Sequence, residues 1–305
     1  MGWKMTFGMI VFFFILVFGM TFIFQTFGTS NTPLVLSDSN NDRTNDINYG
    51  DIPMFAENLR FSRNDISYSI DNSCDLNRKA TMVSAFNIFS SRTGVISFYE
   101  VATDGNIKIF CSDDYIDLGN NLFAAGEGGP SRIINTSGFK VIEEGQIVLY
   151  EEEKCDYPVV ELHELCHVFG FDHSENPNSI MYNTSDCDMR MDANMDRVIR
   201  KLYSIEGLPD AAIESVTANV HGRYLDFNIS ILNEGLTDLG NVTLVIYADE
   251  KEVDSFPLGE LSIGFGRQLR AENVVIGGGF DEVKFFLDSD EIELNEENNV
   301  VVMTV

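Results

Sequence analysis

Residues 163–173 read HELCHVFGFDH, which places three of the chain's four histidines in one short stretch. On a helix at about 100° per residue, His163 and His167 lie one turn apart on the same face, so both imidazoles can reach one ion. Gly170 can adopt a positive φ and end the helix, which brings His173 back as a third ligand. Three neutral nitrogen ligands that leave one position open are typical of a catalytic zinc site. The sequence therefore predicts one Zn²⁺ bound by these three histidines.

Glu164 follows the first predicted ligand and lies beside the ligand face of the helix, about 80° from its centre. Zinc lowers the pKa of a water that it binds toward about 7, so Glu164 can act as general base on that zinc-bound water and return the proton to the leaving amine. A structural zinc site would need four protein ligands, and no cysteine here has that spacing. The pattern predicts hydrolysis of peptide bonds.

The motif HExxHxxGxxH resembles that of the metzincin metalloproteases, and Ser179 to Tyr182 resemble their Met-turn. Met181 stands eight residues after His173, the spacing of the matrixin branch. The resemblance extends over residues 57–206 and implies an α+β domain, with a mixed twisted sheet packed by helices. It also implies that an exposed edge strand binds extended substrate by strand addition. The strand that corresponds to this edge spans residues 121–125, and its candidate substrate-binding residues are Phe123, Ala124 and Ala125.

The order of elements agrees with such a domain over residues 57–207. Alternating and helical hydrophobic spacing predicts four strands, three helices and a glycine-rich loop. The strands are expected at 58–70, 95–101, 105–112 and 145–150, the helices at 77–92, 158–170 and 192–205, and the loop at 125–130. Residues 207–210 read GLPD and are the expected linker to a second domain.

From residue 213 to 305 the pattern changes to short alternating strands separated by Asn and Gly turns, which favours an antiparallel all-β sandwich. Residues 288–299, DSDEIELNEENN, together with the turn at 233–235, resemble the CARDB-type immunoglobulin-like module of surface proteins. That resemblance implies a module that either binds a partner at the cell surface or acts as a spacer. The acidic run could hold Ca²⁺ through its carboxylates, although a solvated acidic turn is the simpler interpretation.

The N-terminal region predicts a membrane anchor. Residues 5–27 contain no charged side chain, and about 20 apolar residues at 1.5 Å each cross a hydrocarbon core of about 30 Å. Lys4 precedes this span and acidic residues follow it, so we expect a single-pass protein of the cell membrane with an extracellular catalytic domain. Secretion after signal cleavage is the alternative. Residues 28–56 are polar and predict a solvated stalk.

Charge and cysteine content narrow the function further. Lys and Arg number 20 against 48 Asp and Glu, a formal net charge of -28, which disfavours a nucleic-acid partner. Five cysteines leave at least one unpaired. One of several pairings joins Cys74 to Cys111 and Cys155 to Cys187. In that pairing the second disulfide would clamp the loop of the metal site, and Cys166 would remain as a core residue.

Two functions follow from these observations. The first is a membrane-anchored zinc metalloendopeptidase that acts on extracellular protein or peptide. The second is a surface adhesion or binding protein with an inactive metalloprotease-like domain. The intact Glu164 favours the first, because an inactive descendant has no chemical need for that base. A zinc hydrolase of non-peptide amides would differ only in the shape of its pocket.

Overall fold

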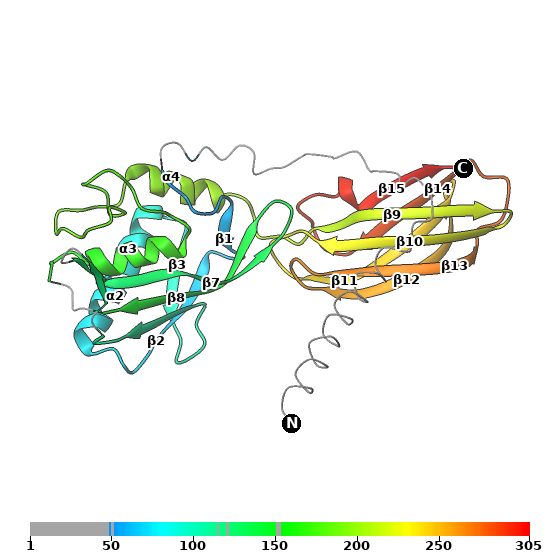
Figure 1. Ribbon diagram of the computed structural model, residues 1–305. Helices are drawn as coiled ribbons and strands as arrows, with labels where there is room; N and C mark the ends of the chain where they lie inside the picture. The colour runs from blue at the N-terminus through cyan, green and yellow to red at the C-terminus, as the bar shows by residue number, and fades with distance from the viewer. Residues whose placement is uncertain (1–48, 50–51, 115, 120–121, 151–153) are drawn as a thin grey trace, which may run out of the picture. The chain divides into compact units, whose positions relative to one another are not determined.

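The computed structural model describes residue 49 and residues 52–114, 116–119, 122–150 and 154–305 (Figure 1). The predicted anchor over residues 5–27 lies outside the described residues, as does most of the predicted stalk. Within the described part of the chain, no helix is both long enough and apolar enough to cross a bilayer.

The N-terminal domain is of the predicted mixed α and β class. Its elements are β1 (Leu59–Phe61), β2 (Asp65–Ile70), α2 (Leu76–Thr93), β3 (Ser97–Glu100), β4 (Ile107–Cys111), β5 (Asp117–Gly119), β6 (Leu122–Phe123), β7 (Gly126–Asn135), β8 (Lys140–Leu149), α3 (Val159–Val168) and α4 (Ala193–Leu202). Strands β3, β2, β4 and β8 are neighbours in that order and run parallel, whereas β7 is antiparallel to β8. Strands β1 and β4 pair with different parts of β8 on the side opposite β7. Since β7 pairs with no other described strand, it is an edge strand.

Two strand predictions were wrong. The single strand expected at 58–70 is two strands, because the polar residues 62–64 separate β1, which pairs with β8, from β2, which pairs with β3 and β4. The glycine-rich run 125–130, expected to be a loop, mostly forms the start of β7. Its glycines permit close packing on α3 rather than a turn. For example, a Cβ on Gly128 would lie 2.3 Å from the backbone oxygen of Glu164.

Helices α2 and α3 pack against each other, and α3 packs on β7 and β8. Asp75 caps α2 by accepting hydrogen bonds from the backbone N–H groups of Asn77 and Arg78, and Gly94 ends the helix at a φ of 68°. The core between helices and sheet is rich in aromatic rings. Phe89 stacks on Phe169 with ring centroids 4.5 Å apart, which fixes α2 against the end of α3.

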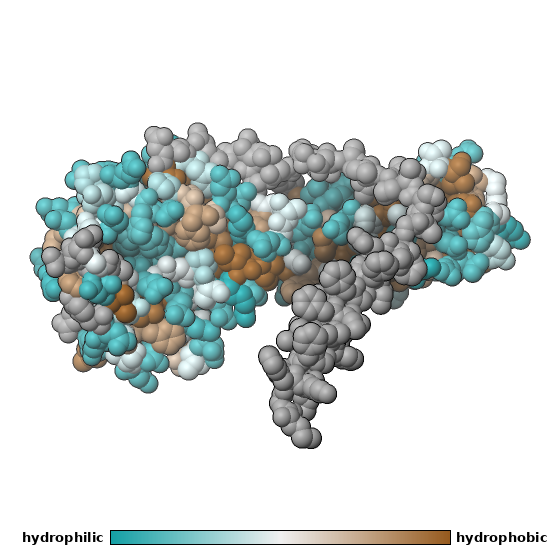
Figure 2. Space-filling view, viewed as in Figure 1, coloured by the Kyte–Doolittle hydropathy of each residue, from teal (hydrophilic) through white to brown (hydrophobic). Residues whose placement is uncertain are grey.

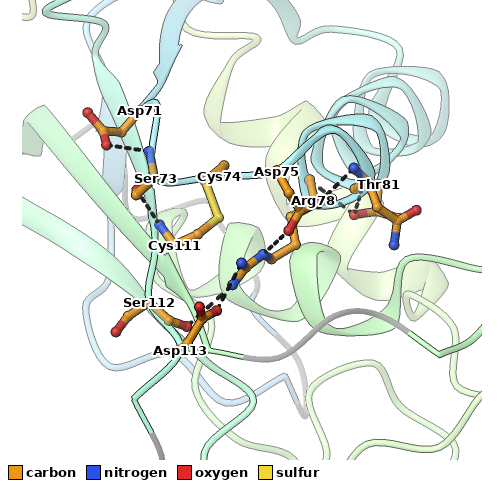
Figure 3. The surroundings of a disulfide bond; sticks show 10 residues. Asp71, Ser73, Cys74, Asp75, Arg78, Thr81, Cys111, Ser112 and Asp113 are labelled. Carbon is orange, nitrogen blue, oxygen red and sulfur yellow. Dashed lines mark hydrogen bonds and ion pairs between the residues drawn. A yellow bond between two sulfur atoms is a disulfide. The ribbon is translucent and has the colours of Figure 1, made fainter.

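A disulfide joins Cys74, just before α2, to Cys111 at the end of β4 (Figure 3). Next to it, Arg78 forms ion pairs with Asp75 at 2.6 Å and with Asp113 at 3.0 Å (Figure 3). The covalent bond and the largely buried guanidinium thus tie the same helix end to the same strand end.

The end of the predicted stalk is part of the folded domain, which corrects the boundary at residue 56. The backbone N–H of Phe55 donates to the carbonyl of Gly170 at 3.1 Å, and that of Asp172 donates to the carbonyl of Pro53 at 2.9 Å. Met54 forms a β-bridge with Phe171. The apolar run 52–56 therefore covers the loop that follows α3, because these side chains lose water-exposed surface there.

The C-terminal domain is an all-β sandwich, as predicted. Its elements are β9 (Ala211–His221), β10 (Tyr224–Asn233), β11 (Leu239–Ala248), β12 (Lys251–Leu261), β13 (Gly266–Val275), β14 (Glu282–Ser289), η1 (Glu297–Asn299) and β15 (Val300–Thr304). One sheet has the order β13-β10-β9 and the other β12-β11-β14-β15, and all pairs are antiparallel. Phe227 of the first sheet contacts Phe256 and Phe285 of the second, with ring centroids 5.8 and 5.3 Å apart.

Buried and solvent-exposed side chains alternate along the sandwich strands, so the interior is apolar and the exterior faces water. Along β10 every second side chain is buried, including Phe227, Ile229 and Ile231. Figure 2 shows that most of the visible surface of the described residues is hydrophilic, as the excess of acidic side chains requires.

Candidate metal centre

Helix α3 carries the first two predicted ligands and Glu164. It begins after Pro158 and ends at Phe169, where the next residue, Gly170, has a φ of 91°. The N–H of Phe171 then donates to the carbonyl of Cys166 at 3.2 Å, which turns the chain back. Gly170, in its left-handed conformation, is the residue to which the sequence assigned the turn. It brings His173 toward His163 and His167.

The three histidines form a cluster able to hold a metal ion. One ligand nitrogen from each of His163, His167 and His173 lies within 4.8 Å of the others. Within the described residues, no other group of three or more His, Cys, Asp or Glu side chains meets this criterion. Their ring centroids are 4.6 to 5.3 Å apart. His163 and His167 are half-buried and His173 is exposed, so the cluster opens to solvent on one side.

Hydrogen bonds orient the first two imidazoles. His163 Nδ1 lies 2.6 Å from the carbonyl oxygen of Ile180, and His167 Nδ1 lies 2.7 Å from that of Phe171. Since a carbonyl oxygen only accepts, each Nδ1 carries the proton and each Nε2 presents a lone pair. The two Nε2 atoms are only 3.0 Å apart. Two lone pairs facing each other repel, so a cation or a shared proton between them would stabilise this arrangement, and the donor set suits zinc.

Burial keeps these histidines neutral. Desolvation lowers the pKa of His163 to about 4, with a further contribution from the neighbouring His167. Desolvation also lowers the pKa of His167. A neutral imidazole is the form that binds a metal, so the protein holds both side chains ready for coordination near neutral pH.

Glu164 is 6% exposed and lies beside the histidine cluster in the same cleft. Burial, assisted by the charge of Glu127, raises the pKa of its carboxyl to about 8, although a hydrogen bond from the backbone of Gly128 opposes this rise. A positive ion nearby would favour the carboxylate. The side chain is thus a carboxyl whose affinity for a proton depends on the metal, which suits a group that takes up and releases a proton.

The turn at residues 179–182 contacts the histidine cluster through His163. Met181 is 2% exposed, and the carbonyl of Ile180 accepts the His163 hydrogen bond. Ser179 Oγ donates to Asp192 Oδ2 at 2.5 Å and accepts from the N–H of Met181 at 3.1 Å. The sequence placed Ser179 in this turn but did not predict its hydrogen bond to Asp192, because the two residues meet only when the chain folds. Their hydrogen bonds hold the carbonyl that orients the first ligand.

A cleft of about 790 Å³ surrounds the cluster. The predicted substrate residues Phe123, Ala124 and Ala125 line it together with the histidines and Glu164. The strand boundaries differ from the prediction, because Leu122 and Phe123 pair with β5, and the edge strand β7 begins at Gly126. The sequence did not point to other residues that line this cleft, among them Phe55, Glu127 and Tyr150.

The remaining cysteines also lie near α3. Cys155 and Cys187 form a disulfide, which joins the segment before α3 to the loop that follows the 179–182 turn. Cys166 is a buried free thiol, and burial raises its pKa well above the ordinary value. Such a thiol is a poor nucleophile, so it acts as a packing residue.

Comparisons with known proteins agree with this geometry. A family model described as Matrixin matches residues 60–204, and a model described as CARDB matches residues 208–303. A search of curated proteins returned no match.

Solved structures that resemble the chain include the CARDB domain of a Pyrococcus furiosus protein in complex with di-metal ions, at 18% identity, with a TM-score of 0.28, covering 32% of this chain and 87% of that one. A protein domain from Methanosarcina acetivorans matches at 20% identity, with a TM-score of 0.28, over 32% of this chain and 90% of the other. The family matches cover the two folded domains separately. The chain therefore joins a matrixin domain, of the zinc metallopeptidase kind, to a C-terminal CARDB domain.

Proposed function

We propose that this chain is a zinc-dependent endopeptidase in which Glu164 acts as the general base and acid. The observation that carries the proposal is the cluster of His163, His167 and His173, in which the Nε2 atoms of the first two lie 3.0 Å apart and a buried carboxyl lies in the same cleft. Such a cluster can bind a metal ion, and a carboxyl beside a metal ion has hydrolytic chemistry as its simplest use.

Zinc bound to His163, His167 and His173 would supply a Lewis acid that polarises the peptide carbonyl and acidifies water. The chain's own residues then handle the proton. Glu164 accepts it from the attacking water and delivers it to the amide nitrogen that leaves. The carbonyls of Ile180 and Phe171 hold the two helix histidines in one tautomer during this exchange.

The substrate we propose is an extended peptide bound along β7. Among the described strands, β7 pairs only with β8, so its outer edge has backbone groups available for strand addition. The residues at its start, Gly126 to Gly128, line the cleft that contains the metal cluster. An edge that runs beyond the cluster can hold several substrate residues, which favours cleavage within a chain over removal of a terminal residue.

The test is hydrolysis of a mixed peptide library by the zinc-loaded protein, with cleavage products identified by mass spectrometry. We expect cuts at internal bonds that stop when a chelator removes zinc and resume when zinc is restored. A zinc-loaded protein that leaves every peptide intact would contradict the proposal, as would hydrolysis that continues at an undiminished rate without zinc.

The packing of β7 on α3 leads to a prediction for this activity. Gly128→Ala would place a Cβ 2.3 Å from the backbone oxygen of Glu164, so the strand and the helix must move apart. Displacement of a catalytic group by about 1 Å costs about 10²-fold in rate, and we expect a loss of that size in kcat/KM with zinc still bound. Gly129→Ala is the matched control, because its Cβ meets nothing within 4 Å. Equal loss in both variants would argue against the close packing.

We further propose that residues 5–27 anchor the protein in the cell membrane with both folded domains outside. The support is the uncharged apolar run, preceded by Lys4 and followed by acidic residues. External protease added to intact cells should remove an epitope at the C-terminus. Full protection of that epitope would reverse the orientation.

A second candidate function is adhesion, in which the C-terminal domain binds a surface partner and the matrixin domain is inactive. The CARDB match over residues 208–303 favours a binding role for that part of the chain. The two functions are compatible, since a binding domain can deliver a peptidase to its substrate. Failure of the library test despite bound zinc would leave adhesion as the main role.

A further inference from the structure

We propose that Phe55 is a specificity-determining residue of the peptidase cleft, where its ring contacts a large apolar side chain of the substrate. The inference deepens the proposed function, on which it rests, and names the substrate class. This class is peptides that carry leucine, phenylalanine or a similarly large apolar residue near the bond that is cut. Phe55 precedes residue 60, where the matrixin match begins, so this part of the cleft comes from outside the matched domain.

Backbone hydrogen bonds hold Phe55 against the turn that leads to the third histidine. Its N–H donates to the carbonyl of Gly170 at 3.1 Å, and the carbonyl of Pro53 accepts from the N–H of Asp172 at 2.9 Å. His173 directly follows Asp172 in the chain. The two bonds therefore fix the segment that carries Phe55 beside one end of the histidine cluster.

The side chains of Met54 and Phe55 have different surroundings. Met54 forms a β-bridge with Phe171, and a Cβ on Gly170 would lie 3.3 Å from Met54 Cε, so Met54 packs on the turn. Phe55 lines the cleft that contains the three histidines, and it is 47% exposed. A phenyl ring that the backbone holds in contact with water costs free energy, and an apolar side chain of a bound peptide would remove that cost.

Two further large apolar residues of the same cleft are exposed. Ile116 is 39% exposed and Phe123 is 37% exposed, and the N–H of Ala124 donates to the carbonyl of Ile116 at 3.0 Å. Single exposed apolar side chains are ordinary, but several that line one cleft indicate a surface that binds apolar groups. Among the described residues that line this cleft, Glu127 and Glu164 are acidic and none is Lys or Arg. The cleft therefore favours apolar substrate side chains over acidic ones.

The contact predicts a particular kinetic effect. Phe55 is not one of the groups that handle the proton or hold the metal, so it contributes equally to binding of the substrate and of the transition state. We expect Phe55→Ala to raise KM about five- to tenfold for peptides with the large apolar residue and to leave kcat within about twofold. Zinc content should stay at one ion per chain.

The first test is cleavage of a randomised decapeptide library by the zinc-saturated full chain, with the products sequenced by mass spectrometry. We expect large apolar residues to be favoured next to the cut bond, and Phe55→Ala to lose this preference at one position only. Phe55→Leu should keep the preference, and Phe55→Lys should favour aspartate or glutamate at that position. An unchanged preference in Phe55→Ala, or an equal loss at every position, would overturn the inference and leave the peptidase function intact.

Phe265→Ala is the matched control. Phe265 is 63% exposed and lies between β12 and β13 of the sandwich. Its removal deletes an exposed phenyl ring of the same size from the other domain, so cleavage preference and KM should match those of the wild type. A shift in preference equal to that of Phe55→Ala would mean that the effect does not come from the cleft, and it would overturn the inference.

A binding measurement separates failure of this inference from failure of the proposed function. The same library is passed over immobilised, zinc-loaded Glu164→Gln protein, and the retained peptides are sequenced. We expect enrichment of large apolar residues, and a smaller enrichment when Phe55→Ala is added. If the wild type cuts no peptide but this difference is found, the proposed function fails and the apolar binding role of Phe55 stands. No enrichment, or one that Phe55→Ala leaves unchanged, would overturn the inference.

Discussion

Glu164→Gln is expected to lower kcat by about 10²- to 10⁴-fold while zinc content stays at one ion per chain. Glutamine keeps the shape of the side chain and can still accept the hydrogen bond from the backbone of Gly128, but it cannot take a proton from water or return it to the leaving nitrogen. The three histidines are untouched, so metal affinity should change little. The measurement is the rate of peptide cleavage at matched zinc occupancy, with zinc determined by elemental analysis.

Glu127→Gln is the matched control for this experiment. Glu127 lines the same cleft, is exposed, and accepts a hydrogen bond from the hydroxyl of Tyr150 at 3.1 Å. Its charge raises the pKa of Glu164, so its loss should move the pH profile of cleavage toward lower pH and leave most of the maximal rate intact. Equal losses in the two variants would mean that the cleft needs negative charge in general, and the assignment of Glu164 as the base would fail.

His167→Ala is expected to weaken zinc binding by more than about 100-fold and to abolish cleavage at ordinary zinc concentrations. Loss of a hydrogen-bonding group behind a ligand already costs about 10- to 100-fold in metal affinity, and loss of the ligand itself should cost more. The change also removes the imidazole that contacts both His163 and His173. The measurement is zinc affinity by competition with a chelator, followed by cleavage rate against zinc concentration.

His221→Ala provides the matched control, because it removes the fourth histidine of the chain. His221 lies at the end of β9 in the sandwich, half-exposed, and its Nε2 is 3.0 Å from a carboxylate oxygen of Asp226. Zinc affinity and cleavage should be unchanged in this variant. Full zinc occupancy and normal cleavage in His167→Ala would overturn the ligand assignment, and a fall in zinc affinity in His221→Ala would indicate a metal site in the sandwich.

Local spacing carried most of what could be predicted about the metal centre. His163, Glu164 and His167 share one helical turn, and the positive φ of Gly170 was predictable because a glycine follows a helical pattern at the point where the chain must reverse. Each of these relations spans fewer than about ten residues. At that separation, helix geometry alone determines which side chains can meet.

The predictions that were wrong are those that depended on contacts between distant segments. The run AGEGGP has the composition of a turn, yet it extends as β7 because Gly128 must pass within contact distance of α3. Residues 52–56 follow a polar stretch, yet they cover the loop after α3 through Met54 and Phe55. In both cases the deciding partner lies far away in the chain, so composition within a window points to the wrong state.

The sequence by itself determined the class of the protein: the three clustered histidines and the helix that carries two of them, the glutamate beside them, the order of the two domains and the all-β character of the second. The tertiary structure alone decided which edge strand lines the cleft, which groups orient the ligands, and where charge is buried. Ile180 and Phe171 orient the histidines only after the chain has turned back, and Ala211 and Glu293 meet across 82 residues. Ligand spacing is a property of one helix, whereas burial and hydrogen-bond partnership depend on segments that only folding brings together.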